Sequence, residues 1–164
     1  MRLPAIAAAT LCATLLSLPA VGRAEPAKAA FFGVLFINTS QSETSAEEEA
    51  RLAALEARLI EKLEASGRYL MVDTAPVAAK INLYANPADC NGCDSDLARE
   101  LGADVAITGE VQKTSDLILG LSIYIRDAGT GALVAGGSAD MRGNTDLIWQ
   151  RTLDWVLRNR VLKP

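Results

Sequence analysis

The sequence predicts an α/β fold: a mixed sheet of about five strands, in the order β-α-β-(α)-α-β-β-β-α, with helices packed on the sheet. An unbroken apolar run at 31–38, FFGVLFIN, is typical of a strand buried on both faces. A helical repeat of leucines and a short apolar run, YLMVD at 69–73, follow it, and this succession predicts a right-handed crossover and a parallel pair. Three strand-like segments near the end complete the sheet.

The first helix is expected at about 45–65. Its start carries two overlapping capping boxes, Thr44 with Glu47 and Ser45 with Glu48, and Ser66-Gly67 marks its end. Apolar residues recur at steps of three and four, which places them on one side of the helix: Leu52, Leu55, Leu59, Ile60 and Leu63. The acidic run at 47–49 lies in the first turn, where the helix dipole favours it, so we interpret it as a solvated face.

The middle of the chain is less regular. A short helix is expected from Pro76, and another at 95–102, capped by Ser95 or Asp94 and ended by Gly102. Three strands are expected within 104–113, 116–127 and 132–143, with a hairpin loop, DAGTG, at 127–131. A last helix is expected from Asn144 or Thr145 to about Arg160, and its buried side should carry Trp149, Leu153, Val156 and Leu157.

Residues 1–24 are typical of a cleaved secretory signal peptide. Arg2 precedes an uncharged stretch, and Gly22 and Ala24 are small residues in the positions that a cut requires. The apolar centre of about 14 residues is shorter than the roughly 20 that span a bilayer, although an uncleaved anchor remains the alternative. A lipoprotein is disfavoured because Leu11 stands before Cys12, where the lipid-attachment pattern has a small residue. We expect a flexible lead at 25–30 and a single α/β domain at 31–164.

The exported chain is acidic. Removing residues 1–24 takes away Arg2 and Arg23 and no acid, which leaves 14 basic residues against 20 acidic ones and a net charge of −6. Binding to nucleic acid or to an anionic membrane needs clustered lysines and arginines, so we expect neither. No second apolar stretch is long enough to cross a membrane, so we expect no stable membrane insertion after cleavage.

Cys90 and Cys93 are the two cysteines that remain after cleavage, in the stretch NPADCNGCDSDLARELGAD. In an oxidising compartment an even number of cysteines favours a structural disulfide, which here would close a short loop and fix the start of the next helix. Thiol–disulfide exchange is the second interpretation, because a helix amino terminus stabilises a thiolate. Metal binding is the third, although a structural zinc needs about four ligands.

The chain contains no histidine. This excludes the Ser-His-Asp and Cys-His catalytic sets, c-type haem attachment and nearly all transition-metal sites. The glycine-bearing segments GTGALVAGG and ITGEV lack the spacing and the Lys-Ser/Thr pair of a nucleotide-binding loop. We therefore predict no catalytic residue, no metal and no cofactor.

Two polar groups are candidates for contact with a ligand or partner. Ligands of mixed sheets usually bind beyond the carboxyl ends of the parallel strands. The first group is expected there, and it consists of Asn38, Thr39 and Ser40 after the first strand with Asp73 and Thr74 after the second. The second group precedes the last helix and consists of Asp140, Arg142, Asn144 and Asp146. The alternative is that these residues form turns, caps and ion pairs.

Trp149 and Trp155 lie nearly two turns apart on the last helix, so they point to different sides of it. At least one is expected at the surface, where tryptophan is a frequent partner contact, and core packing is the alternative. The candidate contact residues are therefore Asn38, Thr39, Asp73, Arg142 and Trp149.

The succession GRYLMVD, LARELGADVAITG, DAGTGALV and RGNTDLIW resembles a family of predicted secreted bacterial proteins of unknown function, over essentially the whole exported chain. In the order of its elements the chain is more distantly similar to three envelope domains: the amino-terminal domain of the Tol system's propeller protein, the periplasmic domain of the curli secretion channel, and the lipoprotein activators of peptidoglycan synthases. The resemblance implies a periplasmic α/β binding or assembly module without catalysis.

We therefore predict a non-enzymatic periplasmic binding or assembly protein that acts by contact with another envelope protein. The first alternative is a periplasmic thiol–disulfide oxidoreductase that uses Cys90 and Cys93. The second follows from an association of similar small secreted proteins with gene clusters for quinone-dependent alcohol oxidation. It is an accessory protein, or a cofactor or metal binder, for a quinoprotein alcohol (methanol) dehydrogenase.

Overall fold

The computed structural model describes residues 25–163, so the predicted signal peptide at 1–24 lies outside the described residues. The strands are β1 (Ala27–Asn38), β2 (Tyr69–Met71), β3 (Val105–Ser115), β4 (Ile118–Asp127) and β5 (Leu133–Met141). The helices are α1 (Ala46–Ala65), α2 (Ala78–Ile81), α3 (Cys93–Glu100) and α4 (Asp146–Val156). Short 3₁₀ turns occupy Ala75–Val77 and Pro87–Asp89, and a π-helical turn at Leu157–Val161 extends α4. The predicted order of elements is confirmed.

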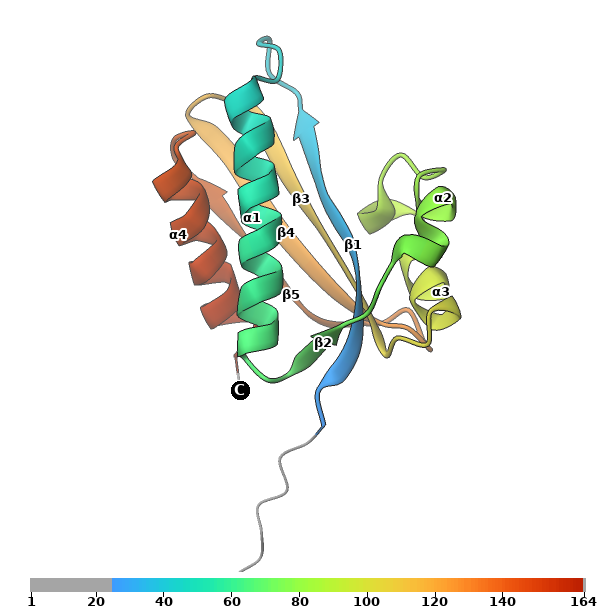
Figure 1. Cartoon of the computed structure of the whole chain (residues 1–164). Coiled ribbons are helices and arrows are strands. Elements are labelled where there is room, and N and C mark those ends of the chain that lie inside the picture. The colour runs from blue at the N-terminus through green and yellow to red at the C-terminus, as the bar shows by residue number, and fades with distance from the viewer. Residues whose placement is uncertain (1–24, 164) are drawn as a thin grey trace, which may run out of the picture.

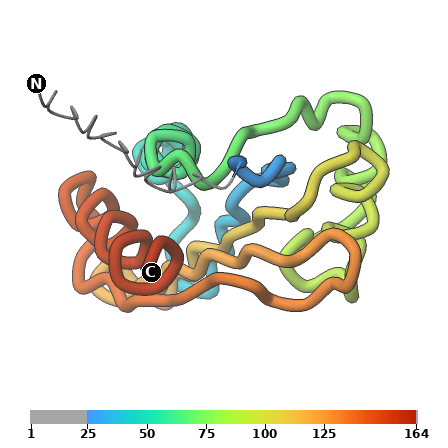
Figure 2. Tube along the Cα trace, turned by 90° about the horizontal axis from the view of Figure 1, so that it is seen from below, coloured from blue at the N-terminus to red at the C-terminus, as the bar shows by residue number. Residues whose placement is uncertain are grey.

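The five strands form one mixed sheet in the order β2-β1-β3-β4-β5. β1 is parallel to both β2 and β3, whereas β3, β4 and β5 form an antiparallel meander. α1 and α4 lie side by side on one face of the sheet (Figure 1), and α2 and α3 lie at the opposite end of the molecule from them (Figure 2). The predicted fold class, an α/β mixed sheet with packed helices, is confirmed.

The α1/α4 face of the sheet holds the main apolar core. Leu119, Leu121, Ile123 and Ile125 of β4 point to this face and are at most 2% exposed, because alternate residues of a strand share one side. Leu59 of α1 and Leu153 of α4 belong to the same core. The predicted buried side of the last helix is confirmed, since Trp149, Leu153, Val156 and Leu157 all belong to this core.

The other face of the sheet, against which α3 packs, is the α2/α3 face, and its core consists mainly of alanines. Its buried cluster consists of Ala30, Ala98, Ala103, Ala106 and Ala128, with Phe32, Val72 and Leu101 at its margin. Small side chains let α3 approach the sheet closely, but they bury little apolar area per residue. α3 packs where β1 and β3 begin and β4 ends, beside Ala30, Ala106 and Ala128.

Several boundaries differ from the prediction. The lead expected at 25–30 is wrong for 27–30, because β1 begins at Ala27 and both Ala29 and Ala30 are fully buried. Alanine and lysine favour strands weakly, so only the pairing with β2 and β3 makes this segment a strand. Leu117 falls within the strand expected at 116–127, yet it lies in the β3–β4 turn and is 73% exposed.

The cap of α1 agrees with the prediction, whereas the start of α3 does not. Ser45 and Glu48 form the capping box of α1, so the second of the two overlapping boxes is the one in use. α3 begins at Cys93 rather than near Ser95, and its N-cap is Gly92, which has a positive φ and supplies no side-chain cap. Asp94 and Ser95 cannot cap it, because both lie inside the first turn, where the Asp94 carboxylate accepts the Ser95 N–H.

Candidate functional site in the groove between α1 and α4

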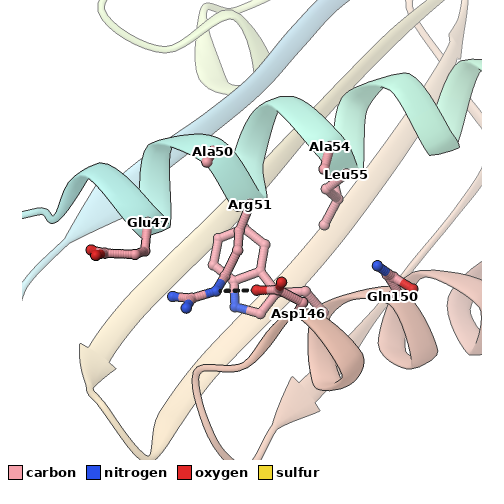
Figure 3. A pocket seen from close by; sticks show the side chains of 8 residues that line it. Glu47, Ala50, Arg51, Ala54, Leu55, Asp146 and Gln150 are labelled. Carbon is pink, nitrogen blue, oxygen red and sulfur yellow. Dashed lines mark hydrogen bonds and ion pairs between the residues drawn. The ribbon is translucent and has the colours of Figure 1, made fainter.

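A surface hollow of about 240 Å³ lies between the first halves of α1 and α4 (Figure 3). Its lining consists of Glu47, Ala50, Arg51, Ala54 and Leu55 from α1 with Asp146, Trp149 and Gln150 from α4. Ala50 and Ala54 lie one turn apart on the same side of α1, and their short side chains leave this space open. The hollow therefore follows directly from two alanines in a helix whose other contacts with α4 are long side chains.

Two arginines fix the spacing of α1 and α4. Arg51 Nε lies 2.7 Å from Asp146 Oδ1, and Arg58 donates to both carboxylate oxygens of Asp154, at 3.0 and 2.7 Å. Such two-pronged pairing orients both partners as well as attracting them. The hydrogen bonds from the Arg58 guanidinium hold the pKa of Asp154 below its ordinary value. The two ion pairs thus join α1 and α4 on either side of Ala54 along the helix.

A buried ion pair lies at the upper end of the groove. Lys113 of β3 and Glu48 of α1 are 3% and 2% exposed, and Lys113 Nζ lies 2.6 Å from Glu48 Oε1. The same ammonium lies 2.8 Å from Asp116 Oδ1 in the β3–β4 turn and donates to Ser42 Oγ at 3.1 Å. One lysine therefore links α1 to β3 with its following turn and to the loop that contains Ser42.

Asn144 links this ion pair to the groove. Its Nδ2 donates to Glu48 Oε1 at 2.5 Å, and its Oδ1 accepts from Trp149 Nε1 at 2.9 Å. Burial works to raise the pKa of Glu48, but hydrogen bonds from Lys113, the Ser45 N–H and Asn144 outweigh it, so the pKa lies below the ordinary value. Hydrogen bonds to Asp116 and Glu48 raise the pKa of Lys113, so the pair stays charged near neutral pH.

Sequence reasoning missed Glu48 and Lys113 as a pair. One signal was present: Lys113 continues the alternation of Val105, Ile107, Gly109 and Val111, so it is a lysine in a core-facing position. A charge in such a position needs a buried partner. Nothing in the sequence named Glu48 as that partner, because its place in a capping box already explained it.

The first predicted polar group is not brought together. Met71, the last residue of β2, lies opposite Ala29, which is nine residues before Asn38 and so roughly 30 Å of strand away at about 3.3 Å per residue. Asn38 instead braces its own loop by donating to Ser42 O and accepting from Ser40 N, and Asp73 accepts from Ala75 N. The prediction of a shared site is wrong because β2 pairs only with the beginning of β1. Contact of Asn38, Thr39 or Asp73 with a partner stays a prediction.

The second predicted group is partly assembled. Asn144 and Asp146 meet Arg51 at the groove, whereas Arg142 is exposed and its contact with a partner stays a prediction. Trp149 is 1% exposed, so the prediction that it contacts a partner is wrong: its ring stacks on Phe36 in the core. The tryptophan at the surface is Trp155, which is 39% exposed.

Cys90 and Cys93 are joined by a disulfide in front of α3. Cys93 is buried and Cys90 is half-buried. Within residues 25–163 no group of three or more histidine, cysteine, aspartate or glutamate side chains is arranged to hold a metal ion. None of the helices in this part of the chain has the length and apolar character that a membrane crossing requires.

The geometry defines a small α/β domain with a surface hollow across which Arg51 and Asp146 pair. The profile of the DUF3280 family, described as "Protein of unknown function (DUF2380)", matches residues 27–161. The chain therefore belongs to this family, which confirms the predicted resemblance to proteins of unknown function. A comparison with curated proteins finds no match.

Solved structures with a similar fold include lipoprotein GNA1162 from Neisseria meningitidis. Its TM-score is 0.50 at 19% identity, over 77% of this chain and 92% of that one. The LpoB C-terminal domain has a TM-score of 0.47 at 20% identity in Escherichia coli, over 75% of this chain and 87% of that one. The same domain from Salmonella enterica has a TM-score of 0.48 at 17% identity, with 74% and 87% covered. At these identities the similarity concerns the fold alone.

Proposed function

We propose that this protein is a non-enzymatic accessory protein of the periplasm that acts by binding another protein of the cell envelope. Export rests on the signal-like features of residues 1–24. The acidic net charge of the exported chain favours a protein partner over nucleic acid. The proposed contact is the groove between α1 and α4, into which the partner inserts an aliphatic side chain.

The single observation that carries this proposal is the size of the hollow together with its apolar lining. At about 240 Å³ it is smaller than the roughly 300–1,000 Å³ typical of small-molecule sites, and it is bordered by Ala50, Ala54 and Leu55. Arg51 and Asp146 pair with each other across it and are thereby occupied. A small, mainly apolar hollow with a charged border suits an anchoring side chain of a protein partner.

Site-specific crosslinking in the native envelope tests the proposal. A photoreactive phenylalanine analogue replaces Ala54, which lines the hollow, or Ala57, which is exposed on α1 outside it. We expect the probe at position 54 to give an adduct with one envelope protein and the probe at 57 to give none. An Ala54→Trp change, which fills the hollow, should abolish an adduct formed from a second probe at Ala50.

The outcomes of this experiment are distinct. Equal adducts from positions 54 and 57 would mean that α1 has no specific contact in the groove, and the proposal would be wrong. Absence of any adduct from 50 and 54 in a folded protein would also contradict it. Circular dichroism of each variant verifies folding, and little change is expected because Ala54 and Ala57 are exposed.

A second candidate function is thiol–disulfide exchange. It is favoured by one observation: half-buried Cys90 is bonded to Cys93, the first residue of α3, where a helix amino terminus stabilises a thiolate. The expected result under the first proposal is that the reduced protein does not accelerate insulin reduction. A role beside a quinone-dependent alcohol dehydrogenase stays a prediction, and a stoichiometric cofactor retained through purification would support it.

A further inference from the structure

β1 is paired on both sides only at its beginning. The three residues of β2 lie opposite Ala27, Lys28 and Ala29, and the last backbone bond on that side joins Val72 N to Ala29 O. On the other side β3 accompanies β1 as far as Asn38. Within the described chain, 25–163, the edge of β1 from 34 to 38 that faces away from β3 therefore has no neighbouring strand (Figure 1).

Hydrogen bonds at the two ends of this stretch identify the backbone groups on the open edge. Thr39 N donates to Lys113 O on β3 at 2.8 Å, whereas Val34 N donates in the other direction, to Glu56 Oε1 on α1 at 2.7 Å. Successive residues of a strand direct these groups to opposite edges. Val34, Phe36 and Asn38 therefore direct their N–H and C=O groups to the open edge. Because Glu56 already occupies the Val34 N–H, the groups that match an added strand are the Val34 C=O and both groups of Phe36 and Asn38.

A hollow lies at the beginning of this edge, beside residues 32–35. β1 has a bulge between Phe31 and Val34, where Gly33 has a φ of +91°. The bulge, Glu56 of α1 and the segment 81–88 enclose a hollow of about 230 Å³, and Ile81 and Tyr84 give it apolar walls. Bulges commonly reshape sheet edges next to functional sites. The beginning of the open edge thus lies between Glu56 of α1 and the segment 81–88.

The basic residues of α1 all lie on one of its long sides. All three of its basic residues, Arg51, Arg58 and Lys62, line the side toward α4. Glu56 lies on the side toward the open edge of β1, and Glu49, seven residues earlier and so about two turns away, shares that side. The open edge therefore has an acidic border, which attracts a basic side chain.

We propose that the open edge of β1 binds an extended segment of a partner protein, about five residues long, with a lysine or arginine beside Glu56. Backbone hydrogen bonds supply the affinity, and the acidic border selects the basic segment. This inference rests on the proposed function and deepens it, because it gives the envelope partner a contact separate from the α1–α4 groove.

Two features of the molecule favour a short partner segment over a second copy of the chain. β1 edges of two copies would bring Glu49 and Glu56 of each against the same residues of the other. β5, the other sheet edge, has nine residues. A second copy's β5 paired with β1 would therefore collide with β2, which already occupies the edge of β1 at Ala27–Ala29. A short free segment meets neither obstacle.

Nuclear magnetic resonance titration tests the proposal with a blocked hexapeptide of alternating lysine and valine. We expect it to shift the backbone amide resonances of Val34, Phe36 and Asn38. The same peptide with glutamate in place of lysine, or with its alternate amides N-methylated, should not bind. Glu49→Lys should weaken binding about fivefold, whereas the matched control Glu61→Lys, on the same helix but away from the edge, should leave it unchanged.

Other outcomes overturn the proposal. Binding that survives N-methylation, or that weakens equally in both glutamate variants, would be unspecific attraction between charges. Shifts confined to β5 or to the α1–α4 groove would place the segment elsewhere. Shifts of residues 34–38 with protein concentration alone would identify the occupant as a second copy. Edge binding in the Ala54→Trp variant separates this proposal from the groove contact, since either can fail alone.

Discussion

The two faces of the sheet are closed by different means. The α1/α4 face is covered by two long helices over leucine, isoleucine and tryptophan side chains, and the buried Glu48–Lys113 pair closes its upper end. The α2/α3 face is covered by a short segment that packs on alanines and contains the Cys90–Cys93 disulfide. The two buried side-chain oxygens without a hydrogen bond within residues 25–163, Asp94 Oδ2 and Thr108 Oγ1, lie on this second face.

The two faces therefore differ in how much they stabilise the fold and in which surfaces they leave open for contacts. Large side chains bury much more apolar area than alanines, so the α1/α4 face supplies most of the stability. The α2/α3 face leaves the row Leu35, Glu110, Ser122 and Ser138 only half covered or exposed, next to the open edge of β1. Both proposed contacts lie where the cover ends: beside Ala54 on one face, and along β1 at the margin of the other.

The largest effect is expected from Lys113→Met, which breaks the α1/α4 face at its upper end. The change leaves the Glu48 carboxylate buried without its cation, and such losses cost about 3–5 kcal/mol. The free energy of unfolding from urea denaturation should fall by that amount.

The double variant Lys113→Met, Glu48→Leu is the matched control. It removes both charges, so we expect it to be more stable than Lys113→Met alone, although the Ser45 N–H and Asn144 lose their acceptor. Costs that simply add would mean that the two side chains do not interact as a buried pair.

A smaller effect is expected from Cys90→Ser, Cys93→Ser, which breaks the α2/α3 face. The bridge closes a loop of few residues, so its loss should lower the free energy of unfolding by at most about 2 kcal/mol. Amide hydrogen exchange should accelerate in 84–96 and remain slow in β4. Partner crosslinking at position 54 should persist, whereas its loss together with insulin reduction by the reduced wild type would instead establish the oxidoreductase.

The smallest effect is expected from acid, which acts on the α1/α4 face through Glu48. The folded-state pKa of Glu48 lies below its ordinary value of 4.5, so its stabilising contribution is complete above that pH and is lost as the pH falls through the folded-state pKa. We expect the free energy of unfolding to decrease below about pH 4.5, and less steeply in Glu48→Gln. Equal slopes in both proteins, from urea denaturation at several pH values, would remove Glu48 as the source.

Much of the fold followed from local pattern. The leucine repeat of α1, its capping box at Ser45 and the alternation in β4 each depend on residues close in the sequence. The start of β1 at Ala27 did not follow, because two neighbouring strands impose it on residues with weak strand preference. Of the candidate site, Asn144 and Asp146 were anticipated, whereas Ala50, Ala54 and the Glu48–Lys113 pair were not.

The order of the elements, their amphipathic sides and the acidic charge follow from the sequence alone, since each depends on composition or on near neighbours, whereas the cysteine pair was one of three interpretations until the structure showed the bridge. Only the tertiary structure decided that β2 ends after three residues, that Trp149 is buried while Trp155 is exposed, and that Lys113 meets Glu48. Those outcomes depend on contacts between segments far apart in the chain. The hollow at Ala54 and the open edge of β1 exist only once those segments are packed together.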